Sequence, residues 1–301
     1  MVGKTDNKIA SAIEDTRDKI DLSQRSLLSE GVQKISYPLN RFDFRGEITR
    51  LLIQKGFIDK AVPLEELNTH IPYQQQVVDQ NLLCEVGKTF YETSVLLRNL
   101  HFELQKYLAE EVLGFDFICQ EIPTVRFHFP VPLIEAYRSS EGVYLGHHSD
   151  TMLGHPFAEI NCWFPLTECS QTNALQLSSL EDEKSILESL CQDIAYDADT
   201  YHKQGRNLFY QKLIKEDEYR QLVINSCHPV AMQYGELLLF DPRCIHGPAE
   251  NQEERTRVSM DFRIIPLESY EKMTREYRSQ GRSGRKFARG DVFFEKSAKQ
   301  L

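Results

Sequence analysis

The sequence lacks the features that mark membrane-spanning and disulfide-stabilised proteins. No apolar run approaches the roughly 18 residues of a membrane span, and the polar N-terminus has no signal-peptide segment. The seven cysteines are odd in number, scattered and without C-x-x-C spacing, which favours buried thiols over a disulfide framework or a zinc site. These absences predict a cytoplasmic protein in a reducing compartment.

Basic residues are also fewer than acidic residues. The chain has 35 Lys and Arg residues against 45 Asp and Glu residues, which gives a formal net charge of −10. This balance disfavours a broad nucleic-acid-binding surface. Internal repeats and low-complexity tracts are absent too, and with 41% hydrophobic residues the 301-residue chain can bury a substantial core as one domain.

A His-x-Asp motif is the first sign of chemistry. His148 and Asp150 flank Ser149. On an extended strand, residues two apart point to the same face, so the imidazole and the carboxylate would converge on one point. They would supply two ligands of a 2-His-1-carboxylate triad, which leaves one face of a ferrous ion open. The adjacent His147 would point the opposite way, and His155 lies beyond the strand.

A distant histidine can complete this triad. Residues 237–240 are typical of a buried strand, and the Asp241-Pro242 pair that follows is typical of a turn. His246 falls just past that turn. We therefore expect His246 to join His148 and Asp150 as the third metal ligand.

Apolar and polar residues alternate strictly between residues 257 and 263. On a strand, one face would carry Val258, Met260 and Phe262. The other face would carry Arg257, Ser259, Asp261 and Arg263. An arginine fork and a hydroxyl on one face can bind a carboxylate, which favours Arg257 and Ser259 as a pair. Arg255 and Arg263 have the same parity and are alternative anchors.

In their order and spacing, these motifs resemble the pattern of Fe(II)/2-oxoglutarate-dependent oxygenases. That pattern is an H-x-D motif, a distant His, and an Arg-x-Ser pair shortly after it. The matching region runs roughly from Thr124 to Pro266. Two stretches, Gly154–Thr167 and Arg257–Pro266, are similar to the small oxygenases of streptomycin-type natural-product pathways.

The resemblance implies a mainly β fold with flanking helices around a double-stranded β-helix core, which is a jelly-roll of the cupin-like kind. It implies Fe(II), 2-oxoglutarate as cosubstrate, and O₂. The distal carboxylate of 2-oxoglutarate would pair with Arg257, and Ser259 would add a hydrogen bond. The reaction would hydroxylate an aliphatic C–H bond and release succinate and CO₂. Related halogenases replace the metal-binding carboxylate with a small residue, so Asp150 favours hydroxylation.

Hydrophobic periodicity predicts how the rest of a single domain, residues 1–301, is organised. The N-terminal support, residues 1–120, is expected to contain helices at Lys8–Asp21, Glu47–Gln54 and Phe90–Leu108. Residues 121–266 would form the core, and residues 267–301 a basic C-terminal extension. The acid-rich stretch 180–224 has helical spacing, and we expect it to be an insert that covers the mouth of the pocket as a lid.

Polar residues on the core strands are candidates for substrate binding. A strand at 124–129 would place Arg126 and His128 on one face, and a strand at 159–164 would do the same for Glu159 and Asn161. A carboxylate facing the barrel suits a small polar, cationic substrate, such as an amino acid, an amino sugar or a guanidino compound. In the alternative interpretation, Glu159 pairs internally with an arginine such as Arg126 or Arg138.

Three other interpretations share parts of this pattern. The same chemistry could act on a protein or an RNA, although net acidity disfavours RNA and the insert favours a closed pocket. A catalytically inactive binding module of the same fold is the second, and release of succinate would exclude it. A zinc-binding cupin is the third, but it would leave the Arg-x-Ser pair without a role.

Overall fold

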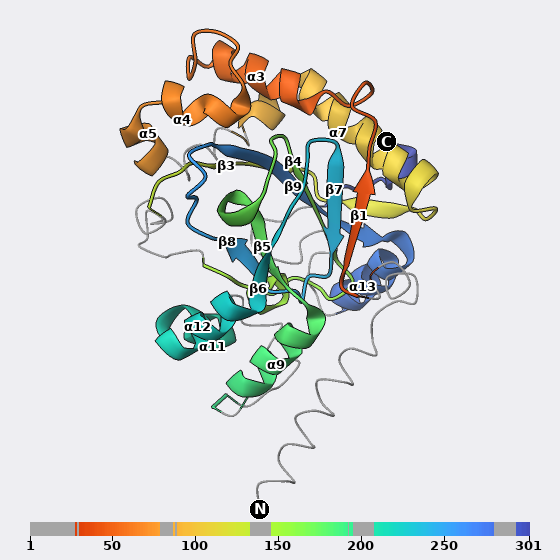
Figure 1. Cartoon of the computed structure of the whole chain (residues 1–301). Helices are drawn as coiled ribbons and strands as arrows, with labels where there is room; N and C mark the ends of the chain where they lie inside the picture. The colour runs from red at the N-terminus through yellow and green to blue at the C-terminus, as the bar shows by residue number, and fades with distance from the viewer. Residues whose placement is uncertain are drawn as a thin grey trace, which may run out of the picture.

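Two antiparallel sheets form the centre of the computed structural model, which describes residues 28, 30–78, 87, 89–132, 146–191, 193–194, 208–279 and 293–301 (Figure 1). The larger sheet has the order β1 (Val32–Ser36), β7 (Glu236–Phe240), β4 (Ile160–Pro165), β9 (Arg257–Pro266) and β2 (Phe117–Cys119), and β3 (Thr124–His128) also pairs with β9. The smaller sheet has the order β6 (Cys227–Val230), β5 (Leu175–Ser178) and β8 (His246–Pro248).

The two sheets pack face to face. Trp163 of β4 and Phe240 of β7 share one buried apolar cluster with Leu175 and Leu177 of β5. Along the chain, β4, β7 and β9 belong to the larger sheet, and β5, β6 and β8 belong to the smaller one. This order confirms antiparallel sheets flanked by helices, while the single-domain division stays a prediction.

Helices from the N-terminal part cover the outer face of the larger sheet. They are α3 (Phe44–Gln54), η1 (Leu64–Glu66), α4 (Leu67–His70), α5 (Tyr73–Val78), α7 (Val95–Tyr107) and the π-helical turn η2 (Leu108–Val112). Ile48 of α3 and Leu104 of α7 are fully buried in the same cluster as Val258, Met260 and Phe262 of β9. The predicted alternation of β9 is therefore confirmed, and so is a helix packed on this sheet.

The predicted helix Phe90–Leu108 is broken at one residue. Ser94 leaves the helical conformation and caps α7, because its hydroxyl accepts a hydrogen bond from Leu97 N–H at 3.0 Å. The same hydroxyl donates to Glu47 Oε1 at 2.5 Å. This contact ties the start of α7 to α3.

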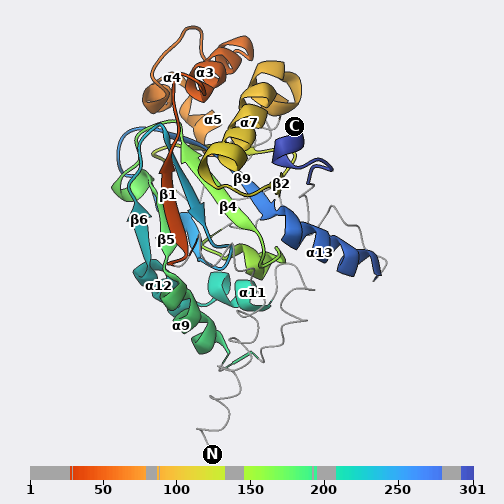
Figure 2. The ribbon, with the colours of Figure 1, turned by 90° about the vertical axis from the view of Figure 1, so that its right-hand side faces the viewer.

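The predicted insert is helical and has its own apolar cluster. Its helices are α9 (Leu180–Leu190), α11 (Leu208–Lys215) and α12 (Asp217–Ser226). Figures 1 and 2 show these helices at the end of the sheets opposite α3 and α7. The C-terminal part adds α13 (Leu267–Ser279) and η5 (Ala298–Gln300).

The prediction of a strand through His148 and Asp150 is only partly correct. His148 forms an isolated antiparallel bridge with His246, but Asp150 already begins a 3₁₀ turn, η3 (Asp150–Leu153). Ser149 causes the change, because its hydroxyl accepts a hydrogen bond from Met152 N–H and caps that turn.

Other predictions fall on residues outside the described ranges. These are the helix Lys8–Asp21, Arg138, and the basic residues between 280 and 292. Within the described ranges, no helix is long and apolar enough to cross a membrane.

Candidate active site

The three predicted metal ligands lie together where the smaller sheet meets η3. His148 Nε2 and His246 Nε2 lie 3.7 Å and 4.0 Å from Asp150 Oδ1. With bonds of about 2.1 Å, as at zinc sites, two ligands of one ion lie at most about 4.2 Å apart. Both distances satisfy this limit. Two imidazoles and one carboxylate form a donor set that suits ferrous iron.

The backbone orients both imidazoles. His148 Nδ1 lies 2.8 Å from the Gly146 carbonyl oxygen, and His246 Nδ1 lies 3.1 Å from that of Cys244. A carbonyl only accepts, so each Nδ1 carries the proton and each Nε2 keeps its lone pair for a metal. Burial lowers the pKa of His148 to about 3 and also lowers the pKa of His246, so both rings are neutral.

A second group of possible metal ligands, Asp150, His155 and Glu159, is already compensated by Arg263. Arg263 Nε lies 3.3 Å from Asp150 Oδ2 and 3.1 Å from Glu159 Oε1. His155 Nδ1 lies 3.0 Å from the same Glu159 oxygen. A guanidinium in the middle of this group leaves no place for a divalent cation, so we interpret it as an ion-pair network that supports the metal ligand Asp150.

Arg263 also explains the ionisation of Asp150. Burial opposes the charged form of this carboxyl and is the largest single effect, but Arg263, His155, His246 and His148 together outweigh it and hold the pKa of Asp150 well below its usual value. For Glu159, burial dominates and raises the pKa, although His155 and Arg263 act in the opposite direction. Of these two carboxyl groups, Asp150 is therefore the one whose ionised form, which can bind a metal, is favoured.

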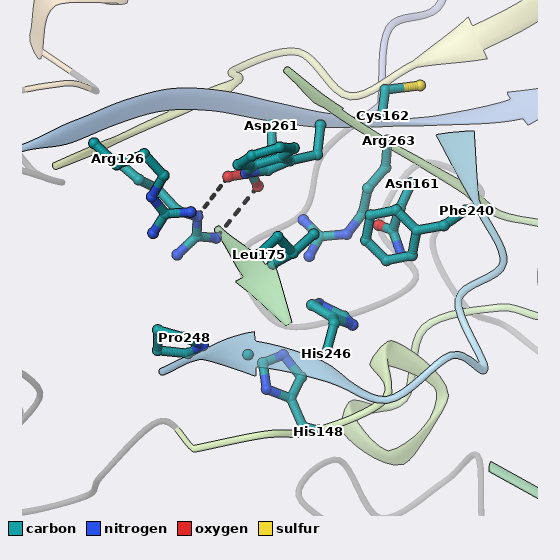
Figure 3. A pocket seen from close by; sticks show the side chains of 13 residues that line it. Arg126, His148, Asn161, Cys162, Leu175, Phe240, His246, Pro248, Asp261 and Arg263 are labelled. Carbon is teal, nitrogen blue, oxygen red and sulfur yellow. Dashed lines mark hydrogen bonds and ion pairs between the residues drawn. The ribbon is translucent and has the colours of Figure 1, made fainter. Parts of the chain in front are cut away.

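A cavity between the two sheets leads to the metal ligands. Figure 3 shows His148 and His246 on one side of it, with Arg126, Asp261 and Arg263 on the side facing them. Apolar walls come from Trp163, Leu175, Phe240 and Pro248. Arg257 lines the same cavity and is 3% exposed, with its guanidinium carbon 5.7 Å from the centre of the Trp163 ring.

On β4 and β9, one polar atom each of a buried amide, an indole and a hydroxyl has no hydrogen-bond partner among the described residues. They are Asn161 Nδ2, Trp163 Nε1 and Ser259 Oγ. A buried donor without an acceptor costs about 1–3 kcal/mol, so such a group indicates a missing ligand. All three atoms can donate; Trp163 and Ser259 lie beside Arg257, and Asn161 lies opposite Arg263 on the neighbouring strand. The residues therefore fit a dicarboxylate such as 2-oxoglutarate.

The structure also separates the alternative arginine anchors. Arg255 is exposed and lies 3.6 Å from Glu168, away from the cavity. Arg263 is engaged with Asp150 and Glu159. Arg257 is buried, lines the cavity and shares the polar face of β9 with Ser259, which supports the choice made from spacing.

Of the four predicted substrate-binding residues, only Arg126 and Asn161 line the cavity. Glu159 is fully buried and pairs with His155 and Arg263, so the internal pairing weighed as the alternative is the one found, with a different arginine. His128 is fully buried opposite Arg257 on the neighbouring strand. Burial, together with the charge of Arg257, holds the pKa of His128 well below its usual value.

Asp261 is the charged residue of the cavity lining to which the sequence interpretation gave no role. Its carboxylate accepts hydrogen bonds from Arg126 Nε at 2.5 Å and Arg126 Nη2 at 3.2 Å. The side chain of Arg126 is 38% exposed and that of Asp261 15%, so this pair lies toward the open side. The alternation of residues 257–263 already placed Asp261 on the face of Arg257 and was a usable signal.

Close backbone packing brings the two histidine segments together. A Cβ on Gly247 would lie 2.9 Å from both Cα and Cγ of His147. Only glycine allows β8 to approach this closely, and the approach permits the bridge between His148 and His246.

Searches against family models give no match. The streptomycin biosynthesis protein StrG of Streptomyces griseus is 29% identical over 195 residues, which cover 64% of this chain and 69% of that protein. This finding confirms the resemblance to proteins of streptomycin-type pathways.

Solved structures similar to this chain include enzymes described as non-heme. The "non-heme monooxygenase, ThoJ-Ni complex" has a TM-score of 0.41 and 12% identity over 82% of this chain and 77% of the other. EctD from S. alaskensis "with 2-oxoglutarate and 5-hydroxyectoine" has a TM-score of 0.41 and 13% identity over 83% and 77%. The α-ketoglutarate-dependent carbocyclase SnoK has a TM-score of 0.37 and 12% identity over 83% and 86%. Because each of these TM-scores is below 0.5, the matches carry no weight for the chemistry of the site.

Proposed function

We propose that this chain is an Fe(II)/2-oxoglutarate-dependent oxygenase that hydroxylates an aliphatic C–H bond of a small polar metabolite. The observation that carries the proposal is one cavity with candidate metal ligands at one end and hydrogen-bond donors near the other. At one end, two neutral imidazoles present Nε2 beside a buried carboxylate. Near the other, a buried arginine lies beside donors that lack acceptors.

The strand order supports a double-stranded β-helix for this enzyme. In the larger sheet, β3, β9, β4 and β7 lie side by side, and in the smaller sheet the His148 bridge continues the order β8, β5, β6. Successive strands after β4 distribute between the sheets in the way a jelly-roll requires. Such a fold places His148 and His246 on neighbouring strands of one sheet.

Each residue has a definite task in this proposal. His148, Asp150 and His246 hold Fe(II), which supplies oxygen activation coupled to the decarboxylation of 2-oxoglutarate to succinate and CO₂. Arg257 and Ser259 bind the distal carboxylate, and the donors of Asn161 and Trp163 complete the polar lining. The carboxylate of Asp150 occupies the position that a halogenase needs for chloride, so hydroxylation is the proposed outcome.

The cationic character expected of the substrate loses its main support. That expectation depended on Glu159, which does not line the cavity and whose charge is compensated by His155 and Arg263. Asp261 is the acidic group in the cavity lining, and a substrate amine would have to compete with Arg126 for it. We therefore propose a small polar metabolite of natural-product metabolism and assign its recognition to Arg126, Asp261 and Asn161.

The test is a pair of measurements on purified protein. Anaerobic titration should show one Fe(II) site per chain, and 2-oxoglutarate with O₂ should yield succinate only when Fe(II) is present. Asp150→Ala should remove both properties, while the exposed Glu168→Ala should keep them. Wild-type protein that binds no Fe(II) would contradict the proposal, and iron binding without succinate formation would favour a binding module.

A further inference from the structure

We propose that the helical insert is a clamp that positions the metal ligands from behind, with Tyr210 as the positioning residue for His148. This inference rests on the proposed function. It replaces the expected lid, because none of the described insert residues lines the cavity. The insert helices instead pack under the segments that carry the ligands.

Tyr210 contacts a ligand directly. Its ring meets that of His148 edge to face, with centroids 6.2 Å apart and planes at 89°. Tyr210 belongs to α11 and is fully buried, so its ring has one fixed place. An aromatic ring packed on the imidazole restricts rotation of His148 further, in addition to its Nδ1 hydrogen bond to Gly146.

The other two ligand segments enter the same apolar cluster. We call it the clamp cluster, and its insert members are Ile186, Leu187, Leu190, Cys191, Phe209, Tyr210, Leu213, Tyr219 and Val223. Met152, two residues after Asp150, is a member, and so is Ile245, which precedes His246. All three ligands are therefore held through neighbours or direct contact with one cluster.

Hydrogen bonds fix the Ile245 backbone against the smaller sheet. Ile245 N–H donates to Ser178 Oγ at 2.9 Å, and Ser178 N–H donates to the Ile245 carbonyl at 2.8 Å. Cys227, the first residue of β6 directly after α12, places its thiol 3.5 Å from the same carbonyl. Because the backbone at Ile245 is held on both sides, packing of the insert is transmitted to His246.

Tyr210→Leu tests the clamp, with Fe(II) or Mn(II) alone as the probe in anaerobic calorimetry. Loss of a partner that orients a ligand typically weakens metal binding about 10- to 100-fold. We expect that range for Tyr210→Leu and a change below about twofold for Tyr210→Phe, which keeps the ring. Tyr219→Leu is the control, since Tyr219 lies in the same cluster but contacts Asp193 and Lys212. It should lower the melting temperature without changing metal affinity.

If Tyr210→Leu does not fold, two milder variants test the same proposal. Ile245→Val and Ile186→Val remove the same methylene group from the same cluster, at positions 0% and 1% exposed. Both should lower the melting temperature similarly, but only Ile245→Val should weaken metal binding. Equal affinities in the two variants, or wild-type affinity in folded Tyr210→Leu, would overturn the clamp. Wild-type protein without any Fe(II) binding would instead contradict the proposed function.

Discussion

Replacing Arg263 by glutamine should strongly destabilise the protein. Asp150 and Glu159 are both fully buried, and Arg263 lies 3.3 Å and 3.1 Å from their oxygens. Removing one partner from a buried ion pair costs about 3–5 kcal/mol, because the remaining charge has no compensation. We therefore expect Arg263→Gln to lower the free energy of unfolding by about 3–5 kcal/mol, measured by urea denaturation of the metal-free protein.

The chain offers a matched control for this change. Arg255→Gln removes an arginine whose side chain is 41% exposed and lies 3.6 Å from Glu168, so the loss should stay below about 1 kcal/mol. Adding Glu159→Gln to the Arg263 variant should restore part of the stability, because it removes one of the two buried carboxylates that lose Arg263. If Arg263→Gln loses no more stability than Arg255→Gln, the ion-pair network does not support the site.

Three further predictions follow from other parts of the structure. Arg257→Ala should weaken 2-oxoglutarate binding by about 2–5 kcal/mol and Ser259→Ala by about 1 kcal/mol, measured as the KM for 2-oxoglutarate; unchanged KM values would refute the anchor. Gly247→Ala should reduce stability by about 1–3 kcal/mol and weaken Fe(II) binding, because the new methyl group meets backbone; a crystal structure with unmoved ligands would contradict this. Burial lowers the pKa of His101 from 6.5, the value in the unfolded chain, to about 3 in the folded protein. As the pH falls, the unfolded chain therefore takes up this proton before the folded protein does, and stability present above pH 6.5 is lost as the pH falls toward 3. His101→Gln should therefore reduce the slope of unfolding free energy against pH by about 1.4 kcal/mol per unit between pH 6 and 4, and an unchanged slope would exclude this role.

Local pattern predicted the faces of β9 well, because alternation is a property of neighbouring residues. Val258, Met260 and Phe262 are fully buried against the helices, and Arg257 lines the cavity on the opposite face. Convergence of His148 and Asp150 was predicted for a reason that is only partly correct. The 3₁₀ turn capped by Ser149, rather than continued strand, brings the carboxylate to the imidazole.

The partner of Glu159 could not be read from the sequence. It depends on the register between β4 and β9, where Asn161 lies opposite Arg263. A shift of two residues would keep the buried faces of both strands but move Arg263 away from Asn161, and no local pattern excludes such a shift. The position of the insert depends on long-range packing in the same way. Its helical spacing was predicted correctly, while its contact with Met152 and Ile245 was not.

Arg263 and the clamp cluster act on the metal ligands from different sides. Arg263 belongs to the larger sheet and fixes the charge and place of Asp150 through contacts to both carboxylate oxygens. The clamp cluster lies behind the smaller sheet and constrains His148 through Tyr210. The support from Arg263 is electrostatic and should weaken when a substitution removes the charge. The support from Tyr210 comes from packing and should weaken when a substitution removes the ring and leaves the charge unchanged. Arg263→Gln and Tyr210→Leu are thus independent perturbations, and their effects on Fe(II) affinity should add in the double variant.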